Sequence, residues 1–294
     1  MNRYAYLLIL PGLIYIVIFS YVPIYGLLLS FKTYNFSKGI WGSPWVGLKN
    51  FEYLFRDKNF WIAFNNTLII SFGKIFLSLP FPILLAILLS EVRFTGYKRV
   101  IQSILYLPHF LSWVIVAGII FNLLSVTDGT LSKTISAYTN QSPPVILANA
   151  KYFRTLVFSS HIWKTAGWGT VIYMAAIVGI DPTLYEAAII DGANRFQRIW
   201  HITLPSLIFT VIILTILNIG SVMNAGFDQI FNLYDPSVYK VGDIIDTFVY
   251  RVGLLSTSKM EYGVTVGLFK SIINCALLLT ANQIAKWIGY DGIL

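Results

Sequence analysis

IWHITLPSLIFTVIILTILNIGSVMNAGF, residues 199–227, is a long stretch without a single Asp, Glu, Lys or Arg. A bilayer core of about 30 Å is crossed by roughly 20 apolar residues in a helix. Open strands cannot satisfy their backbone hydrogen bonds in lipid, and the alternating pattern of a membrane barrel is absent from the chain. The stretch therefore predicts a transmembrane helix.

Five further stretches have a similar length and carry at most one charged residue each. Hydrophobic residues make up 56% of the 294-residue chain and charged residues 12%, and the mean hydropathy is +0.70. This balance excludes an ordinary soluble domain. The first stretch is too long for the core of a signal peptide and lacks a cleavage pattern, so we expect it to be a helix of the protein. The sequence thus predicts an all-α integral membrane protein with six transmembrane helices: Tyr4–Phe31, Asn59–Ser90, Val100–Thr127, Thr155–Ile180, Ile199–Phe227 and Tyr262–Ala285.

Six helices place both termini on one side of the membrane, together with a short connection at Glu91–Arg99 and a longer one at Asp181–Pro205. The loops on the opposite side are long enough to fold as small caps, and they hold more of the basic residues. The positive-inside rule therefore does not decide the orientation. The opposite-side loops are Lys32–Lys58, Asp128–Arg154 and Asp228–Lys259.

Chemistry-bearing residues do not form a recognisable catalytic pattern. The three histidines are scattered, no His, Cys, Asp or Glu group has metal-ligand spacing, and Cys275 is the one cysteine. No Gly-rich phosphate-binding loop is present, so the chain is not expected to hydrolyse ATP. A net charge of +8 is spread thinly over the loops, which argues against nucleic-acid binding. We expect no catalytic residue, no metal site and no cofactor bound by this chain.

The connection after the fourth predicted span reads DPTLYEAAIIDGA from position 181. Asp181 can cap free helix amides, Pro182 suits the first helical position, and Gly192 can take the left-handed conformation that ends a helix. These signals predict a helix of about nine residues. Its Leu184, Ala187, Ala188 and Asp191 follow i, i+3, i+4 and i+7 spacing, so they share a small, nearly flat face. That face predicts a docking surface for another protein, and the alternative is an amphipathic connector lying on the bilayer.

The spacing around this helix resembles a known signature. Glu186, Ala187 and Ala188, then Gly192, and then Ile202, Leu204 and Pro205 match the EAA motif of binding-protein-dependent ABC importer permeases. The run YLPHFLSW at Tyr106–Trp113 is similar to the LplB-like branch of carbohydrate permeases, which includes carriers of oligosaccharides released from plant or algal polysaccharides. The resemblance extends over nearly the whole chain and implies the type I ABC importer permease (MetI/MalF-like) fold.

The same resemblance implies a set of partners and an orientation in a bacterial cell membrane. The chain would be one transmembrane permease domain, 1–294, paired with a second homologous permease, so that each forms half of the translocation pathway. Two cytoplasmic ATPases would hold ATP and Mg, and a solute-binding protein outside the cell would deliver the oligosaccharide. Segment 181–205 would then be a cytoplasmic coupling loop, and both termini would be cytoplasmic. The residues implied in ATPase coupling are Leu184, Glu186, Ala187, Ala188, Asp191, Gly192 and Pro205.

Polar residues inside the fourth and fifth spans indicate a substrate pathway, because such residues are costly in lipid and usually face a cavity or a partner. Trp168 lies near mid-helix, where an aromatic ring can stack on a sugar. Two alternatives stay open: a structural ion pair at Lys164, and helix-to-helix bonds at the two asparagines. Lys74 favours an acidic substrate, such as alginate or pectin fragments, unless it is paired internally. The candidate pathway residues are His161, Lys164, Trp168, Thr215, Asn218, Ser221 and Asn224.

Two other classes of membrane protein share this hydrophobicity. An ion-gradient-driven secondary transporter usually shows internal repeats with broken helices, and the first and last three spans show no convincing repeat. A membrane scaffold would leave transport intact when deleted. The secondary transporter also leaves the docking helix at Asp181–Gly192 unexplained.

Overall fold

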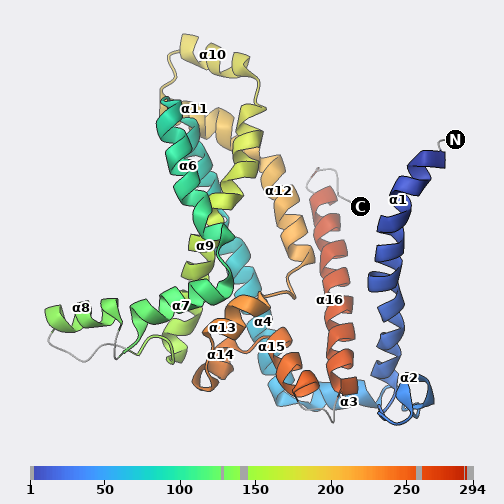
Figure 1. The fold of residues 1–294 in the computed structure, drawn as a ribbon. Coiled ribbons are helices and arrows are strands. Elements are labelled where there is room, and N and C mark those ends of the chain that lie inside the picture. Colours follow the sequence, from blue (N-terminus) through green and yellow to red (C-terminus); the bar gives the residue numbers. More distant parts are fainter. Residues whose placement is uncertain (1–2, 127–128, 140–144, 256–259, 288, 290–294) are drawn as a thin grey trace. The chain divides into compact units, whose positions relative to one another are not determined.

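The computed structural model describes residues 3–126, 129–139, 145–255, 260–287 and 289, and helices dominate this part of the chain (Figure 1). Four helical segments are long and apolar enough to cross a membrane, and six are if each of two bent pairs counts as one span. The chain forms two compact units, Met1–Trp61 with Ile245–Ile273 and Ile62–Ile244 with Asn274–Leu294. The expectation of a single domain stays a prediction, and each unit is described by itself.

The first unit begins with the first predicted span. Helix α1 (Arg3–Ile16) continues without a break into a π-helical turn (Val17–Tyr21) and a 3-10 segment (Val22–Phe31). Aromatic rings make much of the core of this unit, since Phe60 lies 5.5 Å from Phe269 and 6.5 Å from Phe248 between ring centroids. Its other helical elements are α2 (Gly39–Gly42), α3 (Lys49–Arg56), α15 (Ile245–Val249), a π-helical turn (Tyr250–Leu254) and the first half of α16 (Met260–Trp287).

The second unit is built around helix α9 (Ala150–Val178), which packs against α5, α6 and α12. Glycine makes this packing close: a Cβ atom at Gly167 would overlap the backbone carbonyl of Leu105 on α6. The helical elements of the unit are α4 (Lys58–Ser78, from Ile62 on), α5 (Pro80–Ser90), α6 (Thr95–Phe110), α7 (Trp113–Leu124), α8 (Thr130–Thr139), α9, α10 (Pro182–Ile190), α11 (Arg195–Arg198), a π-helical turn (Ile199–Thr203), α12 (Leu204–Gly220), α13 (Phe227–Leu233), a 3-10 turn (Pro236–Val238), α14 (Tyr239–Gly242) and the second half of α16.

The second predicted span is confirmed as a 33-residue segment, Lys58–Ser90. It is divided into α4 and α5 at Leu79. Pro80 and Pro82 follow this point, and each lacks the amide that would continue the hydrogen-bond ladder. The two prolines therefore account for the interruption of the helix at this point.

The third predicted span is wrong as one continuous helix. Helices α6 and α7 meet at an angle of 98°. Ser112 begins the new helix by accepting a hydrogen bond from the amide of Ile115 at 3.3 Å, and the cap defines a start that composition does not reveal. The predicted span end Thr127, like the loop residues Asp128 and Lys259, lies outside the described residues.

The fifth predicted span ends seven residues earlier than expected, at Gly220 instead of Phe227. The chain then unwinds, and Gly226, at φ +90°, precedes α13. Non-helical backbone at membrane depth is tolerated where it is buried in protein or lines a cavity. Both conditions are met here, as the site below shows.

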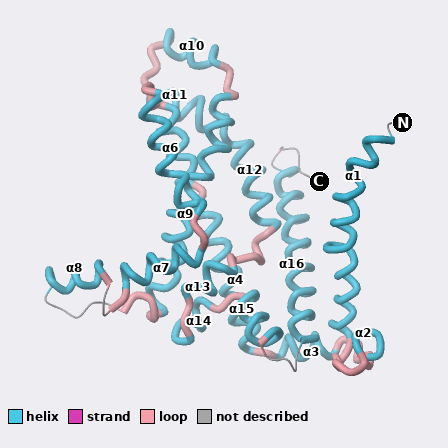
Figure 2. Tube along the Cα trace, in the orientation of Figure 1, coloured by secondary structure: helices cyan, strands magenta, loops and turns pink. Residues whose placement is uncertain are grey.

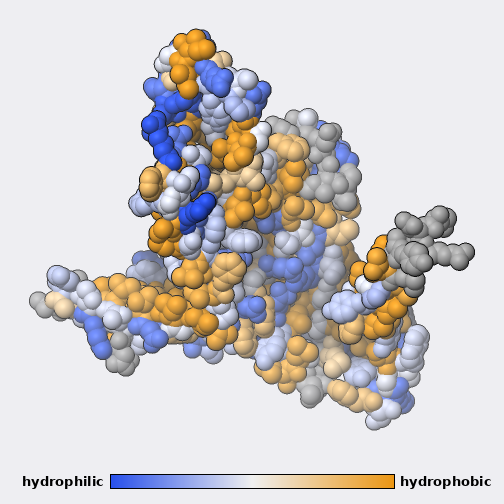
Figure 3. All heavy atoms as spheres, turned by 45° about the horizontal axis from the view of Figure 1, so that its top comes forward, coloured by the Kyte–Doolittle hydropathy of each residue, from blue (hydrophilic) through white to orange (hydrophobic). Residues whose placement is uncertain are grey.

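Large apolar side chains cover much of the surface, as the hydrophobic colouring of one face makes plain (Figure 3). Exposed apolar area on this scale indicates contact with lipid or with a partner chain. The long helices therefore present the surface expected of a membrane protein.

Candidate functional site: a cavity and a capped helix between α9 and α12

Helix α10 is fixed by local caps at both ends, and loop segments flank it on either side (Figure 2). Asp181 accepts a hydrogen bond from the amide of Thr183 at 2.9 Å, and this bond holds the pKa of the Asp181 carboxyl below its usual value. At the other end Gly192 has φ +78°, and the amide of Ala193 donates to the carbonyl of Ala188. The bond from Ala193 to Ala188 and the left-handed Gly192 belong to a Schellman motif, which ends the helix. The predicted helix of nine residues, with its two caps, is confirmed.

A side-chain bond ties α10 to the next helical segment. The hydroxyl of Tyr185 lies 2.9 Å from that of Thr203, which is buried at the end of the π-helical turn. Asn194 and Gln197 form a reciprocal capping box at α11. The loop after α10 is therefore a fixed structure, and Pro205 follows it as the second residue of α12.

The face predicted for docking is mostly open. Leu184, Ala187 and Asp191 are exposed, as is Glu186 outside this face, and Ala188 is half-buried. Ala188 and Asp191 also border a hollow of about 290 Å³ together with Gly192. A partner docked on this face would therefore meet both the Leu184 side of α10 and the hollow beside Asp191.

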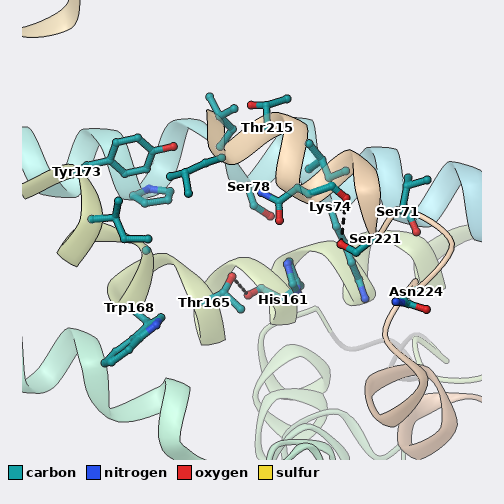
Figure 4. A pocket seen from close by; sticks show the side chains of 18 of the residues that line it. Ser71, Lys74, Ser78, His161, Thr165, Trp168, Tyr173, Thr215, Ser221 and Asn224 are labelled. Carbon is teal, nitrogen blue, oxygen red and sulfur yellow. Dashed lines mark hydrogen bonds between the residues drawn. The ribbon is translucent and has the colours of Figure 1, made fainter. Parts of the chain in front are cut away.

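The second feature is a cavity of about 420 Å³ inside the second unit (Figure 4). Its walls come from α4, α5, α9 and α12, from the unwound segment after α12, and from His109 at the end of α6. Six of the seven predicted pathway residues line it: His161, Trp168, Thr215, Asn218, Ser221 and Asn224.

Lys164 is the predicted pathway residue that does not line this cavity. Its ammonium donates to the carbonyls of Pro108 at 3.3 Å, His109 at 2.7 Å and Leu111. A cation at a helix C-terminus interacts favourably with the helix dipole and with the free carbonyls. Lys164 thus caps α6 at the sharp bend. Its contact with substrate stays a prediction.

Trp168 is half exposed and one face of its ring is already covered. The ring stacks on His109 at 4.8 Å between centroids, with an interplanar angle of 7°. Its relative exposure of 44% leaves ring surface at the cavity wall. Stacking on a sugar would therefore use the part of the ring that His109 leaves open.

Several lining residues were missed or given little weight from the sequence. Ser71, Lys74 and Ser78 form a polar stripe along α4 with i, i+3 and i+7 spacing, which is the signal that could have found them. Thr165 and Tyr173 on α9 carried no distinct signal. The α4 stripe faces the cavity opposite the α9 residues (Figure 4).

Side chains from two other helices hold the unwound segment Ser221–Gly226. The ammonium of Lys74 donates to the carbonyl of Ala225 at 2.6 Å. The amide of Met223 donates to the side-chain oxygen of Asn274 on α16 at 3.0 Å. These two bonds, together with backbone turn bonds such as that from the amide of Asn224 to the carbonyl of Ser221, hold the segment. It forms part of the cavity wall.

Comparison with known proteins agrees with this arrangement. Residues 75–227 match the model of the family described as "Binding-protein-dependent transport system inner membrane component". Protein LplB of Bacillus subtilis is 42% identical over 99% of this chain and 91% of its own length. The polygalacturonan/rhamnogalacturonan transport system permease protein YteP of the same organism is also 42% identical, over 99% and 90%.

A solved structure shares the fold. One chain of a bacterial alginate ABC transporter, crystallised with its alginate pentasaccharide-bound periplasmic protein, matches with a TM-score of 0.90 and 36% identity, over 99% of this chain and 97% of that one. The MetI-like permease fold expected from the sequence is confirmed. This chain belongs to the family of binding-protein-dependent transport system inner membrane components.

Proposed function

We propose that this chain is the permease subunit of an ATP-driven ABC importer that carries oligosaccharides into the cell, acidic ones included. The observation that carries the proposal is the position of α10 in the chain. The capped helix follows α9 after a short turn and is joined to α12 through α11 and the π-helical turn, and both α9 and α12 contribute to the cavity wall. A rigid displacement of α10 would therefore move both walls.

The motor for that displacement lies in other chains. We assign ATP and Mg to two partner ATPases at the cytoplasmic face, and half of the pathway to a second permease. The coupling loop and both termini are then cytoplasmic, and the solute-binding protein docks on the other face. A carrier of this kind works because the ligand binds differently to the outward-open and inward-open states.

The substrate class is supported by two independent features. The cavity combines hydroxyl, amide and aromatic side chains, which suit the hydroxyls and apolar ring faces of sugars. YteP is named as a permease of polygalacturonan/rhamnogalacturonan transport, and the solved structure is that of an alginate ABC transporter. All three polymers contain uronate sugars, so an acidic oligosaccharide fits best.

The test uses the complex of both permeases, the ATPases and the binding protein, reconstituted in liposomes. We expect a panel of uronate oligosaccharides to stimulate ATP hydrolysis and to accumulate only when ATP is supplied. Dissipating proton and sodium gradients with ionophores should leave this uptake unchanged. Uptake that needs an ion gradient and ignores ATP would show a secondary transporter instead.

A further inference from the structure

Lys74 is a buried cation without a counter-charge in the described chain. It is 8% exposed and lies in the wall of the cavity. None of the described residues that line the cavity is acidic. The hydrogen bond described for its ammonium goes to the carbonyl of Ala225, although an ammonium has three protons to donate.

Two other lysines in membrane-spanning helices provide a comparison. Lys164 donates to three backbone carbonyls, and Lys270 pairs with the carboxylate of Asp246. Both are thus paired within the chain. Lys74 differs from both in facing the cavity with part of its donor capacity unused.

The hydroxyls beside Lys74 show the same deficit. The side-chain oxygens of Ser71 and Ser78 are buried, and neither has a hydrogen-bond partner. They lie three residues before and four residues after Lys74 on the same helix face. Burying unpaired polar groups is costly, and a charge costs more than a hydroxyl. The α4 wall of the cavity therefore holds more hydrogen-bond donors than the described residues supply acceptors for.

We infer that Lys74, in the polar stripe that it forms with Ser71 and Ser78, recognises a carboxylate of the transported oligosaccharide and is the residue that selects for the acid form. A carboxylate accepts several hydrogen bonds and supplies the missing negative charge. Glycine at position 226 leaves room for the ammonium, because a Cβ atom there would lie 2.8 Å from the nitrogen, and Lys74 borders the open cavity where a carboxylate would lie. The cavity volume of about 420 Å³ falls within the range of small-ligand sites, about 300–1,000 Å³. This inference rests on the proposed function.

A purely structural role for Lys74, holding Ala225 in place, makes a different prediction. Loss of that bond would disturb the unwound segment whatever the substrate. Loss of carboxylate recognition would affect acidic substrates and spare neutral ones. The two roles are therefore separated by comparing a uronate trisaccharide with its uncharged methyl ester.

The experiment measures uptake of both trisaccharides by complexes carrying Lys74→Gln, Lys74→Arg or the control Lys240→Gln. Lys240 is exposed in the same unit, so its replacement makes the same charge change away from the cavity. The same binding protein serves every variant, so its own preference cancels. Lys74→Gln should lower the acid-to-ester uptake ratio by about 10-fold or more, since bonds to charged groups are worth that much. Lys74→Arg and Lys240→Gln should keep the ratio of the unaltered complex.

Binding of the labelled acid trisaccharide to the complex in nanodiscs, without the binding protein, gives a second measurement, and Lys74→Gln should weaken it by a similar factor. Equal loss of acid and ester uptake in Lys74→Gln would overturn the inference in favour of the structural role, and an unchanged ratio would overturn it outright. Neither result would contradict the proposed function of the chain as an oligosaccharide permease. Failure of the unaltered complex to transport any oligosaccharide would instead remove the proposed function, and this inference with it.

Discussion

Gly192 is the residue on which the end of α10 depends. Its φ of +78° belongs to the left-handed region, and a Cβ atom there would meet nothing within 4 Å. A side chain at position 192 would therefore not clash, but holding its backbone in the left-handed conformation would cost roughly 1–2 kcal/mol for most residues and least for Asn.

We predict that Gly192→Val uncouples ATP hydrolysis from uptake, because a β-branched residue resists this conformation and the orientation of α10 changes. Gly192→Asn is the matched control and should keep most of the uptake. Both variants should insert and assemble normally. The measurement is substrate molecules imported per ATP hydrolysed in liposomes, and equal coupling in the two variants would show that the left-handed cap is not needed.

At the scale of single residues, the sequence predicts well what neighbouring residues decide. Asp181, Pro182 and Gly192 act within one helix, so their roles could be predicted from spacing. Lys164 shares α9 with the predicted pathway residues His161 and Trp168. Its partners His109 and Leu111, however, lie 55 and 53 residues away. No local pattern reports such contacts.

Among the helices, the contact of α9 with α6 depends on the absence of a side chain at Gly167. The atom that a Cβ would meet is a backbone oxygen, which cannot move without moving α6. Small residues at such crossings allow close approach of membrane helices.

We predict that Gly167→Ala destabilises the complex by about 1–3 kcal/mol, the usual cost of overpacking. Gly118→Ala on α7 is the control, because a Cβ there meets nothing within 4 Å and alanine favours the helix. Thermal unfolding of the complex in detergent is the measurement. Equal melting temperatures for the two variants would mean that α6 and α9 do not pack this closely.

Helix directions and some helix ends could not be predicted from the sequence, because contacts between distant residues decide them. The apolar run Val100–Thr127 is long enough for one span, yet α6 and α7 within it meet at 98°. The cap at Ser112 and the hydrogen bonds from Lys164 to carbonyls at the end of α6 stabilise this bend. Val222 and Met223 are as apolar as the helix before them. Composition therefore cannot show that they lie in an unwound segment held by Lys74 and Asn274.

On the scale of the whole molecule, the side of the membrane that each loop occupies is the feature the sequence predicts least, because basic residues are distributed over both sides. The helical membrane fold and the family could be predicted from composition and from the motif around Glu186. Coupling of uptake to ATP hydrolysis requires that α10 meets an ATPase in the cytoplasm.

Cysteine cross-linking tests this claim most directly. Cys275 is first replaced by Ser, and single cysteines are then placed at Ala187 on the exposed side of α10 and, as the control, at the exposed Ser37 in the loop predicted to lie outside. We predict that Ala187→Cys cross-links to the ATPase subunit in membranes and is protected from an impermeant thiol reagent added outside whole cells, whereas Ser37→Cys reacts with the reagent and does not cross-link. Reaction of Ala187→Cys from outside, or its failure to cross-link in an assembled complex, would contradict the assignment of α10 as the coupling helix.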